Sequence, residues 1–561
     1  MRNDPDPSLP PEELKKAIDV EVKAFEESFL WLEKHMPPSF FKAIDHETKI
    51  LIARNLMSFC LQDYFSPIYF KHKIIVLCHD APNADLKIFK KFKQYVIRYY
   101  RDFTSNAPAP HDTSGKNLRI AFLYFYDLSK NESLTKEKRT ELFAHAREHN
   151  PNLKDEEIEA LVNGITPNFL NSMKGERLSL ALSLFFKAKN EEQCQYEVWR
   201  KEDWQAKEAP SLQLVLAWRN VPKSGFLYRL AKVANSHNLT LRRVVGTYID
   251  LSSTETILIL SLGLHGKAGK AAWEEADVED FLREFCLIKY FDTDDKVGAV
   301  FTDTHLLTGN EAHLVRNLIA FAHQVLVYGD VNFYSYENVV EGFCRHPELT
   351  VQLPQLFAAK FHPEKSDLIQ YEALKKEFSQ NVDKLDTGHA INDLRRKNVL
   401  KQGLQFIDHT LKTNFYRGNK SSFAFRLDPK YMDLVPYERK DKFPELPFGI
   451  FFIRGMHFIG FNIRFKDLAR GGVRTVIPER MESYLYERGH IFSEAYNLAY
   501  TQQKKNKDIP EGGAKTAILL KPFEVFAEEE EIFKKEMKAD GIDQALWEDK
   551  LKIYRRDHRL D

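Results

Sequence analysis

The stretch that decides the fold is FGIFFIRGMHFIGFNIRFKDLARGGVRTV, residues Phe448–Val476. The apolar run Gly449–Ile453 and the alternation of apolar and polar residues over Phe461–Phe465 predict two neighbouring strands. The second strand leads into the turn Arg470–Gly472. Because glycine lacks a Cβ, this turn would let backbone amides approach a ligand closely, within reach of the flanking guanidinium groups. The stretch therefore predicts a binding turn at the end of a strand.

A second informative stretch is YNLAYTQQKKNKDIPEGGAKTAILLKP, residues Tyr496–Pro522. It contains the end of a long helix that we predict through Leu485 to Ala499, and then a strand predicted at Ala517–Leu520. Phe423, Phe425 and Leu427 alternate upstream and predict one more strand, so the order is strand, strand, strand, helix and strand. This order predicts the opening of an α/β domain.

Three cations come from the ends of these predicted elements: Arg470, Lys505 and Lys515. Two cations suit a small dicarboxylate, one for each carboxylate. A lysine placed beside them, close to like charge in a partly dry cleft, could serve as a base near neutral pH. The alternative is a solvated charged surface, which we prefer for other cations of this region: Lys504, Lys507 and Arg480.

One architectural theme recurs upstream. A strand at Ile74–Cys78, a helix from Asp85 and a strand at Leu118–Tyr124 form its first instance. The second instance has the order strand, helix, strand, strand, helix and strand: Leu212–Trp218, Phe226–Ala234, Leu241–Tyr248, Thr256–Ser261, Val278–Phe285 and Leu287–Phe291. This βαββαβ order is the ferredoxin-like plan, which is also the plan of ACT-type regulatory modules. If it is a sensor, we expect its ligand at Asn220–Gly225, which leads into a helix N-terminus.

The fold class predicted from these patterns is a multidomain chain of α+β and α/β parts. We expect an N-terminal ACT-like α/β module over residues 1–130 and a helical linker over 131–205. An ACT-like βαββαβ module over 206–300 and a helical region over 301–415 follow. The last part, residues 416–561, is expected to be a partial α/β substrate domain.

Composition excludes several classes of function. The 561 residues contain 81 Lys+Arg and 81 Asp+Glu, so the net charge is zero. This balance argues against a large positively charged surface that would bind nucleic acid or an anionic membrane. The five cysteines are widely spaced without a CxxC motif, which indicates reduced thiols and no zinc site. The polar, proline-rich N-terminus resembles neither a secretory signal nor a transit peptide. We therefore expect a cytoplasmic protein without a metal.

The two quoted stretches resemble the large NAD-specific glutamate dehydrogenases of fungi and some bacteria. SSFAFRLDP at Ser421–Pro429 and FLWLEKHMP at Phe29–Pro37 are also similar to that family. The resemblance implies oxidative deamination of L-glutamate to 2-oxoglutarate and ammonia, with hydride transfer to NAD, a reaction of amino-acid catabolism. The chain would be an N-terminal half that ends within the substrate domain.

The resemblance also implies residue roles. Arg470 would bind the side-chain carboxylate of glutamate, Lys505 would bind its α-carboxylate, and Lys515 would activate water against the iminium intermediate. The turn Gly471–Gly472 would contact the substrate, and the loop holding Gly512 and Gly513 would close over it. Thr516 stands where the family usually has glycine, so the backbone after Lys515 is expected to be stiffer.

No G-x-G-x-x-G with a following acidic residue occurs in the sequence, so we assign no residue of this chain to NAD. NAD would be bound by a domain missing from this chain, which predicts a homo-oligomer or a second chain carrying that domain, and no glutamate oxidation by this chain alone. The alternative is a catalytically inactive regulatory or scaffolding chain that binds an amino acid or partner subunits.

Overall fold

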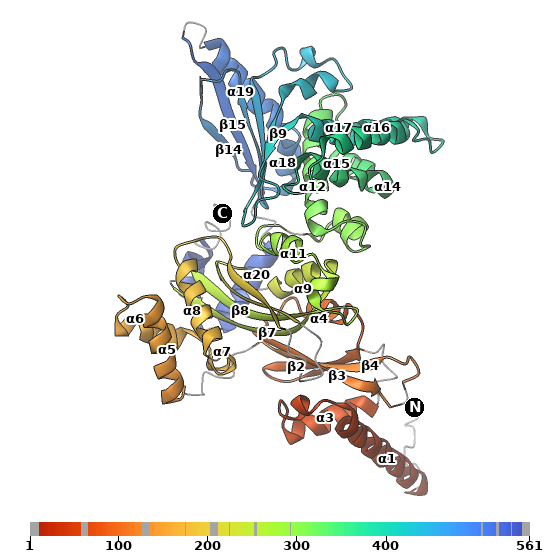
Figure 1. Cartoon of the computed structure of the whole chain (residues 1–561), viewed down its shortest axis with the longest axis vertical. Coiled ribbons are helices and arrows are strands. Elements are labelled where there is room, and N and C mark those ends of the chain that lie inside the picture. The colour runs from red at the N-terminus through yellow and green to blue at the C-terminus, as the bar shows by residue number, and fades with distance from the viewer. Residues whose placement is uncertain are drawn as a thin grey trace, which may run out of the picture. The chain divides into compact units, whose positions relative to one another are not determined.

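The structure, a computed structural model, describes residues 11–57, 65–110, 112–125, 134–173, 175–201, 211–223, 225–251, 255–291, 293–505, 509–522, 527–539 and 541–552. The chain divides into two compact units. Unit 1 comprises Met1–Asp250 with Thr256–Ala276, and unit 2 comprises Leu251–Glu255 with Asp277–Asp561. Each unit has its own β-sheet with helices packed on it, so the chain is a multidomain α+β protein (Figure 1).

Unit 1 is built on one antiparallel sheet of eight described strands in the order β1-β2-β4-β3-β7-β8-β6-β5. The strands are β1 Phe65–Tyr69, β2 Lys73–His79, β3 Tyr99–Pro108, β4 Asn117–Tyr124, β5 Gln195–Lys201, β6 Ser211–Arg219, β7 Leu239–Asp250 and β8 Thr256–Gly266. Strands predicted at Ile74–Cys78, Leu118–Tyr124, Leu212–Trp218, Leu241–Tyr248 and Thr256–Ser261 are thereby confirmed.

The sheet consists of two ββαββ repeats joined at β3 and β7. The first repeat contains β1 to β4, with helix α4, Ala84–Lys91, between β2 and β3 in the chain. The second repeat contains β5 to β8, with helix α9, Phe226–Ser236, between β6 and β7. The order β1-β2-β4-β3 is mirrored as β7-β8-β6-β5, and Tyr99 pairs with Val245 at the junction. The recurring theme in the sequence is therefore a structural duplication within one sheet.

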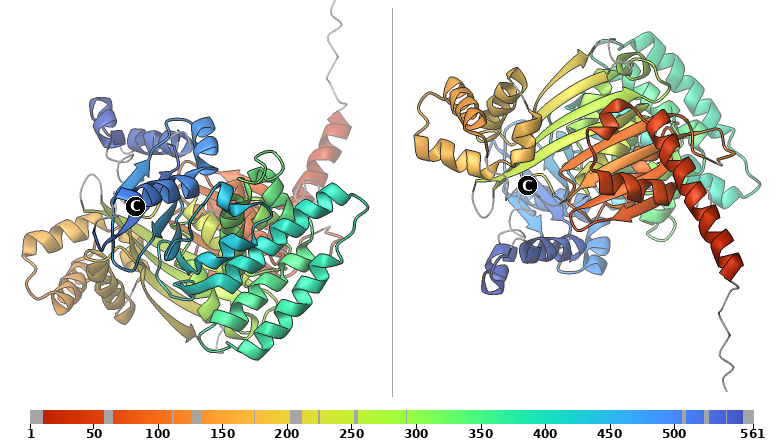
Figure 2. Two further views of the ribbon diagram at one scale, coloured as in Figure 1. Left: turned by 90° about the horizontal axis from the view of Figure 1, so that it is seen from above. Right: turned by 90° about the horizontal axis from the view of Figure 1, so that it is seen from below.

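Helices cover both faces of the first repeat. Helices α1, Pro11–His35, and α3, His46–Met57, pack with α2, Pro38–Phe41, on one face (Figure 2). The apolar core beneath them includes Ile75, Leu77, Phe103, Leu118, Ile120 and Phe122 from the sheet. Since successive strand residues face opposite sides, Arg119 lies on the other face, the side of α4. Four further helices precede β5: α5 Lys136–His149, α6 Asp155–Gly164, α7 Pro167–Ser172 and α8 Glu176–Ala188.

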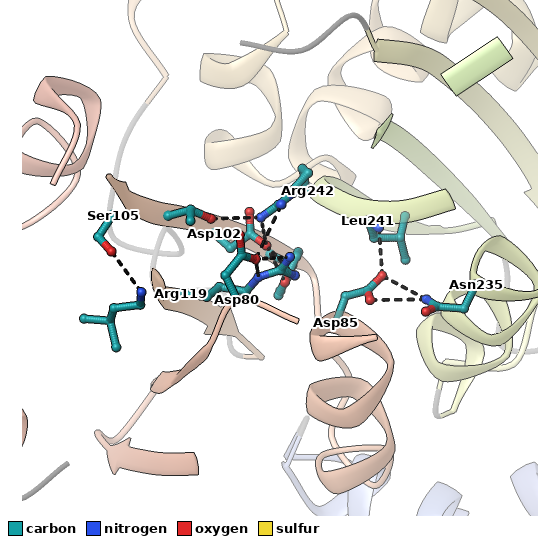
Figure 3. Close-up of polar contacts among 11 residues, drawn as sticks. Asp80, Asp85, Asp102, Ser105, Arg119, Asn235, Leu241 and Arg242 are labelled. Atoms are coloured by element: carbon teal, nitrogen blue, oxygen red, sulfur yellow. Dashed lines mark hydrogen bonds and ion pairs between the residues drawn. The ribbon is translucent and has the colours of Figure 1, made fainter. Parts of the chain in front are cut away.

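Polar contacts tie the two repeats together on this face (Figure 3). The fully buried Asp85 of α4 accepts hydrogen bonds from the Leu241 amide at 2.8 Å and from Asn235 Nδ2 at 3.2 Å. Arg119, 1% exposed, pairs with Asp80 at 2.6 Å and Asp102 at 3.1 Å. Burial raises the pKa of Asp85, with Arg119 opposing that rise. These contacts fix α4 of the first repeat against α9 and β7 of the second.

The strand predicted at Leu287–Phe291 is wrong. Residues 286–290 form turns after α11, Val278–Phe285, and the place beside β6 is taken by β5, Gln195–Lys201. The apolar character of Leu287–Phe291 reflects burial, since Leu287 is 1% and Phe291 4% exposed. A short apolar run does not by itself distinguish a buried strand from buried turns.

Unit 2 carries the second sheet, in which β13-β15-β12-β11-β10-β9 are neighbours and β14 also pairs with β15. The strands are β9 Thr410–Thr413, β10 Phe423–Leu427, β11 Gly449–Arg454, β12 Phe458–Arg464, β13 Ala469–Arg470, β14 Val473–Val476 and β15 Gly512–Leu520. Pairing is antiparallel from β9 to β15, whereas β13 and β14 run parallel to β15.

Besides its sheet, unit 2 contains the following helices. They are α11, the π-helix Gly298–Thr302, α12 Gly309–Leu326, α13 Tyr336–Cys344, α14 Pro347–Thr350, α15 Gln352–Phe361, α16 Leu368–Asp383, α17 Ala390–His409, α18 Met481–Arg488, α19 Ile491–Lys505 and α20 Ala527–Ala539. Of these, α18 and α19 pack on β15. Phe321 of the central helix α12 contacts Phe452 of β11, with ring centroids 5.9 Å apart. The long helix predicted from Leu485 to Ala499 is two helices, because the chain turns at Gly489 between α18 and α19.

Candidate functional site

The candidate site centres on Lys515 in β15. Lys515 pairs with Ile463 of β12, and Thr516 pairs with Val473 of β14. Lys515 shares a face of the strand with Ala517 and Leu519, which are fully buried. Helix α19 packs on that face, so Lys515 projects toward the helix-covered side of the sheet, where it is half-buried.

The glycines predicted to form a closing loop are part of a strand. Gly512 and Gly513 begin β15, which corrects the expectation of a flexible loop and places the start of the strand before Ala517. A Cβ on Gly513 would lie 2.7 Å from Gln503 Cα of α19, and the amide of Gly513 donates to Gln503 Oε1 at 2.8 Å. Gly513 therefore allows close approach of helix and strand, whereas Gly512 is approached by Lys466.

The Gly471–Gly472 turn links β13 to β14 and lies beside Lys515. A Cβ on Gly472 would lie 3.6 Å from Lys515 Nζ, and the Gly472 carbonyl accepts from the Thr516 amide at 3.1 Å. The backbone at Gly471 approaches Ala514 too closely for any side chain. The ammonium group of Lys515 thus lies over the double-glycine turn that the sequence predicts as a binding turn.

Arg470 is the last residue of β13 and pairs with Gly513, two residues before Lys515. Paired residues point to the same face, so the register places Arg470 on the face that carries Lys515. Its guanidinium Nε lies 3.3 Å from Glu511 Oε2, and the two side chains are 60% and 37% exposed. Glu511 therefore already pairs with one nitrogen of the guanidinium group that we expect to bind a substrate carboxylate.

Lys505 ends α19, as predicted, and is exposed. Residues 506–508, which follow it and include Lys507, lie outside the described residues. The convergence of Lys505 with Arg470 and Lys515 on one pocket stays a prediction.

Sequence reasoning missed two polar residues at the site. Gln503 of α19 holds the Gly513 amide, and Asn462 of β12 donates to Thr516 Oγ1 at 2.7 Å. Thr516 therefore has a partner on the sheet face opposite Lys515, and it continues β15. The sequence pattern that could have identified Gln503 is its spacing: it follows Ala499 by four residues and so shares the helix face toward β15.

The predicted sensor loop Asn220–Gly225 is bound internally. Asn220 has a φ of 51°, its amide donates to the Thr256 carbonyl at 2.8 Å, and its side chain accepts from the Thr256 amide at 3.2 Å. Ser224 lies outside the described residues. Asn220 therefore extends the pairing of β6 with β8 by one residue.

Neither a metal-ligand cluster nor a membrane-spanning helix is found among the described residues. No three His, Cys, Asp or Glu side chains come together there as ligands for a metal ion. Among the helices of the described part, none has the length and apolarity needed to cross a bilayer.

Comparison with known proteins finds similarity to one family over the part of the chain that contains this site. Residues 383–542 match the family model for bacterial NAD-glutamate dehydrogenase, catalytic domain. Glutamate dehydrogenase 2 of Dictyostelium discoideum is 36% identical over 193 residues, which are 33% of this chain and 17% of that protein. The NAD-specific glutamate dehydrogenase of Saccharomyces cerevisiae is 47% identical over 124 residues, or 22% of this chain and 11% of that protein. The corresponding protein of Neurospora crassa is 44% identical over 117 residues, or 21% and 11%.

Each of these alignments covers less than a fifth of the relative. The matched segment, residues 383–542, contains β9 to β15 and helices α18 and α19, and with them Arg470, Lys505 and Lys515. Residues 383–542 of this chain are therefore homologous to the catalytic domain of the NAD-glutamate dehydrogenases.

Proposed function

We propose that unit 2 binds L-glutamate and 2-oxoglutarate and serves NAD-dependent oxidative deamination of glutamate. The observation that carries the proposal is the position of Lys515 Nζ over the Gly471–Gly472 turn, within the segment that matches the catalytic domain. Arg470 stands one strand away on the same face. An ammonium and a guanidinium group in this relation suit the two carboxylates of a small dicarboxylate.

The residues would act as follows. Arg470 exchanges Glu511 for the side-chain carboxylate of glutamate, and Lys505 holds the α-carboxylate. Lys515 is placed to move a proton to or from water at the α-carbon. The close packing of α19 on Gly513 fixes the direction from which Lys515 reaches the substrate.

NAD supplies the hydride acceptor for this reaction. The described strands of unit 2 pair antiparallel except at β13 and β14, and no described turn there joins a parallel strand to a helix through a G-x-G-x-x-G loop. These residues do not fit a dinucleotide, so we assign none of them to NAD and derive no step through it.

Calorimetric titration of the full chain with 2-oxoglutarate tests the proposal. We expect saturable binding that Lys515→Ala and Arg470→Ala each weaken about tenfold to a hundredfold, since each removes a charge-assisted hydrogen bond. Lys504→Ala is the matched control, because Lys504 is an exposed neighbour that pairs with Glu445. Equal affinity in the Lys515 and control variants would refute the assignment. No turnover is expected after addition of NAD to this chain alone, because we assign none of its residues to NAD, and turnover would contradict that assignment.

We further propose that unit 1 is regulatory and ACT-like. Support comes from the strand orders β6-β8-β7 and β2-β4-β3, in which the strand that precedes each helix is separated by one strand from the strand that follows it, as in the ferredoxin-like plan. A thermal-shift panel of amino acids tests this, since a ligand that binds only the folded state raises the melting temperature. No shift at millimolar concentration would contradict a sensor role.

We also propose a cytoplasmic oligomer. Four cysteines of the described residues, Cys78, Cys194, Cys286 and Cys344, are buried free thiols, which suits a reducing compartment. Apolar side chains are exposed on and beside the edge strand β14: Leu468 at 66%, Val473 at 64% and Ile477 at 49%. Such an edge suits burial against another subunit. Light scattering during size-exclusion chromatography measures the assembly, and a monomer would contradict it.

A further inference from the structure

Three arginines of unit 2 present buried donor atoms that have no acceptor. They are Arg316 in α12, Arg454 at the end of β11 and Arg488 at the end of α18. The atoms Arg316 Nη1, Arg454 Nη1 and Arg488 Nε are shielded from solvent and have no hydrogen-bond partner among the described residues. Buried polar groups are nearly always paired in native proteins, so a group of such donors indicates a missing acceptor.

Arg316 and Arg488 are partly satisfied, whereas Arg454 is not. Arg316 binds Asp295 through Nε at 2.8 Å and Nη2 at 2.7 Å, and it is 4% exposed. Arg488 stacks over the Tyr336 ring, with its Cζ 3.5 Å from the ring centroid. Within the described residues, no hydrogen bond or ion pair engages the guanidinium group of Arg454.

Contacts connect the elements that carry the three arginines. Arg454 pairs with Phe423 of β10, whose ring lies 5.8 Å from that of His313, one turn before Arg316 in α12. The Arg488 carbonyl accepts a hydrogen bond from Gln324, which also belongs to α12.

Burial lowers the pKa of Arg454, and the groups that act on it electrostatically include Tyr336, Arg316 and Asp295. Tyr336 is the ring on which Arg488 stacks, so it connects Arg488 with Arg454. His313 faces the same charges, since burial and then Arg316 and Arg454 lower its pKa. Asp295, which pairs with Arg316, is a carboxylate that acts on Arg454, so one carboxylate faces the two guanidinium groups of Arg316 and Arg454.

The geometry points to a binding site for a small oxyanion, a phosphate group or a carboxylate, at Arg316, Arg454 and Arg488. A guanidinium group presents paired N–H donors in a plane, which matches two oxygens of one oxyanion. A desolvated cation without a counter-ion is unfavourable, and an oxyanion would supply both the missing charge and the missing acceptors. The Asp295 side chain is 44% exposed, so solvent reaches the edge of the cluster.

This site is separate from the one proposed for glutamate. Lys515 is aligned through Ile463 with Ile450, and Arg454 lies four residues further along β11. Arg454 and Lys515 are therefore about 13 Å apart along the strands and about 10 Å apart across them. A single small dicarboxylate cannot bridge that distance, so the inference extends beyond the proposed function and does not depend on it.

Thermal unfolding of the full chain tests the site with inorganic phosphate and with succinate, at constant ionic strength. We expect a saturable rise of the melting temperature with at least one probe, and no rise in Arg454→Met. Arg454→Lys keeps the charge and loses the paired donors, so its affinity is expected to fall about tenfold. Arg480→Met is the matched control, because Arg480 is exposed next to α18 and has no role in the cluster. A response to phosphate alone assigns a phosphate group, and a response to succinate alone assigns a carboxylate.

Two further measurements test whether Arg454 itself binds the anion. In buffer without multivalent anions, Arg454→Met is expected to melt at or above the wild-type temperature, because it removes an uncompensated buried charge. A clear fall instead would mean that Arg454 has a structural role, and it would overturn the inference. A response unchanged by Arg454→Met would overturn it too. Lys515→Ala must leave the phosphate response intact, and its loss there would assign the response to the glutamate site.

Discussion

Substitution of Gly513 by alanine tests whether close packing of α19 on β15 holds the candidate site together. The new Cβ would lie 2.7 Å from Gln503 Cα, with the Ala499 carbonyl and the Gln503 amide closer still. Real Cβ atoms essentially never lie within 3.0 Å of such atoms, so the two contacts at 2.2 Å require helix and strand to separate by at least 0.8 Å. The same separation strains the hydrogen bond from the Gly513 amide to Gln503 Oε1.

The expected cost follows from this displacement. Overpacking of this kind lowers the free energy of unfolding by about 1–3 kcal/mol. Lys515 lies two residues further along the same face, so a shift approaching 1 Å would weaken its productive contact with substrate up to about a hundredfold. Urea denaturation measures the first quantity, and calorimetric titration with 2-oxoglutarate measures the second.

Gly418→Ala is the matched control, since a Cβ there meets nothing within 4 Å. It should change the free energy of unfolding by no more than about 0.5 kcal/mol. If Gly513→Ala were as stable as Gly418→Ala and bound 2-oxoglutarate equally well, the packing argument would be refuted.

Three further outcomes are expected. Asp85→Ala should destabilise unit 1 by about 2–4 kcal/mol in urea denaturation, because it leaves the Leu241 amide and the Asn235 amide group without their acceptor; an unchanged midpoint would contradict this. Glu511→Gln should strengthen 2-oxoglutarate binding about two- to fivefold by releasing Arg470 from an exposed ion pair, whereas weaker binding would mean that Glu511 positions Arg470 for substrate. Burial lowers the pKa of Lys420 from 10.5 to about 8, so between these values the unfolded chain binds more protons and stability should rise with pH. Lys420→Met should remove that rise, of about 3 kcal/mol in total, from denaturation curves measured across this pH range, and a rise that persists in the variant would contradict its origin in Lys420.

Much of the local structure could be predicted because it depends on local patterns. Short apolar runs and alternating stretches predicted β2, β4, β6, β7, β8, β11 and β12, and the glycine pair at Gly471–Gly472 predicted the turn beside a cation. The turn at Gly489 was missed because the apolar spacing of α18 continues in α19. Gly512 and Gly513 were interpreted as a loop because glycine weakens strand propensity, whereas here Lys466 approaches Gly512 and helix α19 approaches Gly513 too closely for a side chain.

By itself, the sequence determined the identities and order of these elements, the absence of net charge, and the dense motifs around Arg470 and Lys515. Only the tertiary structure decided which segments became neighbours. It joined β3 to β7, placed β5 rather than Leu287–Phe291 beside β6, and gathered Arg316, Arg454 and Arg488 from a helix, a strand and a second helix. Pairing and burial between distant segments depend on the fit of whole surfaces, and periodicity within a short window carries no information about that fit.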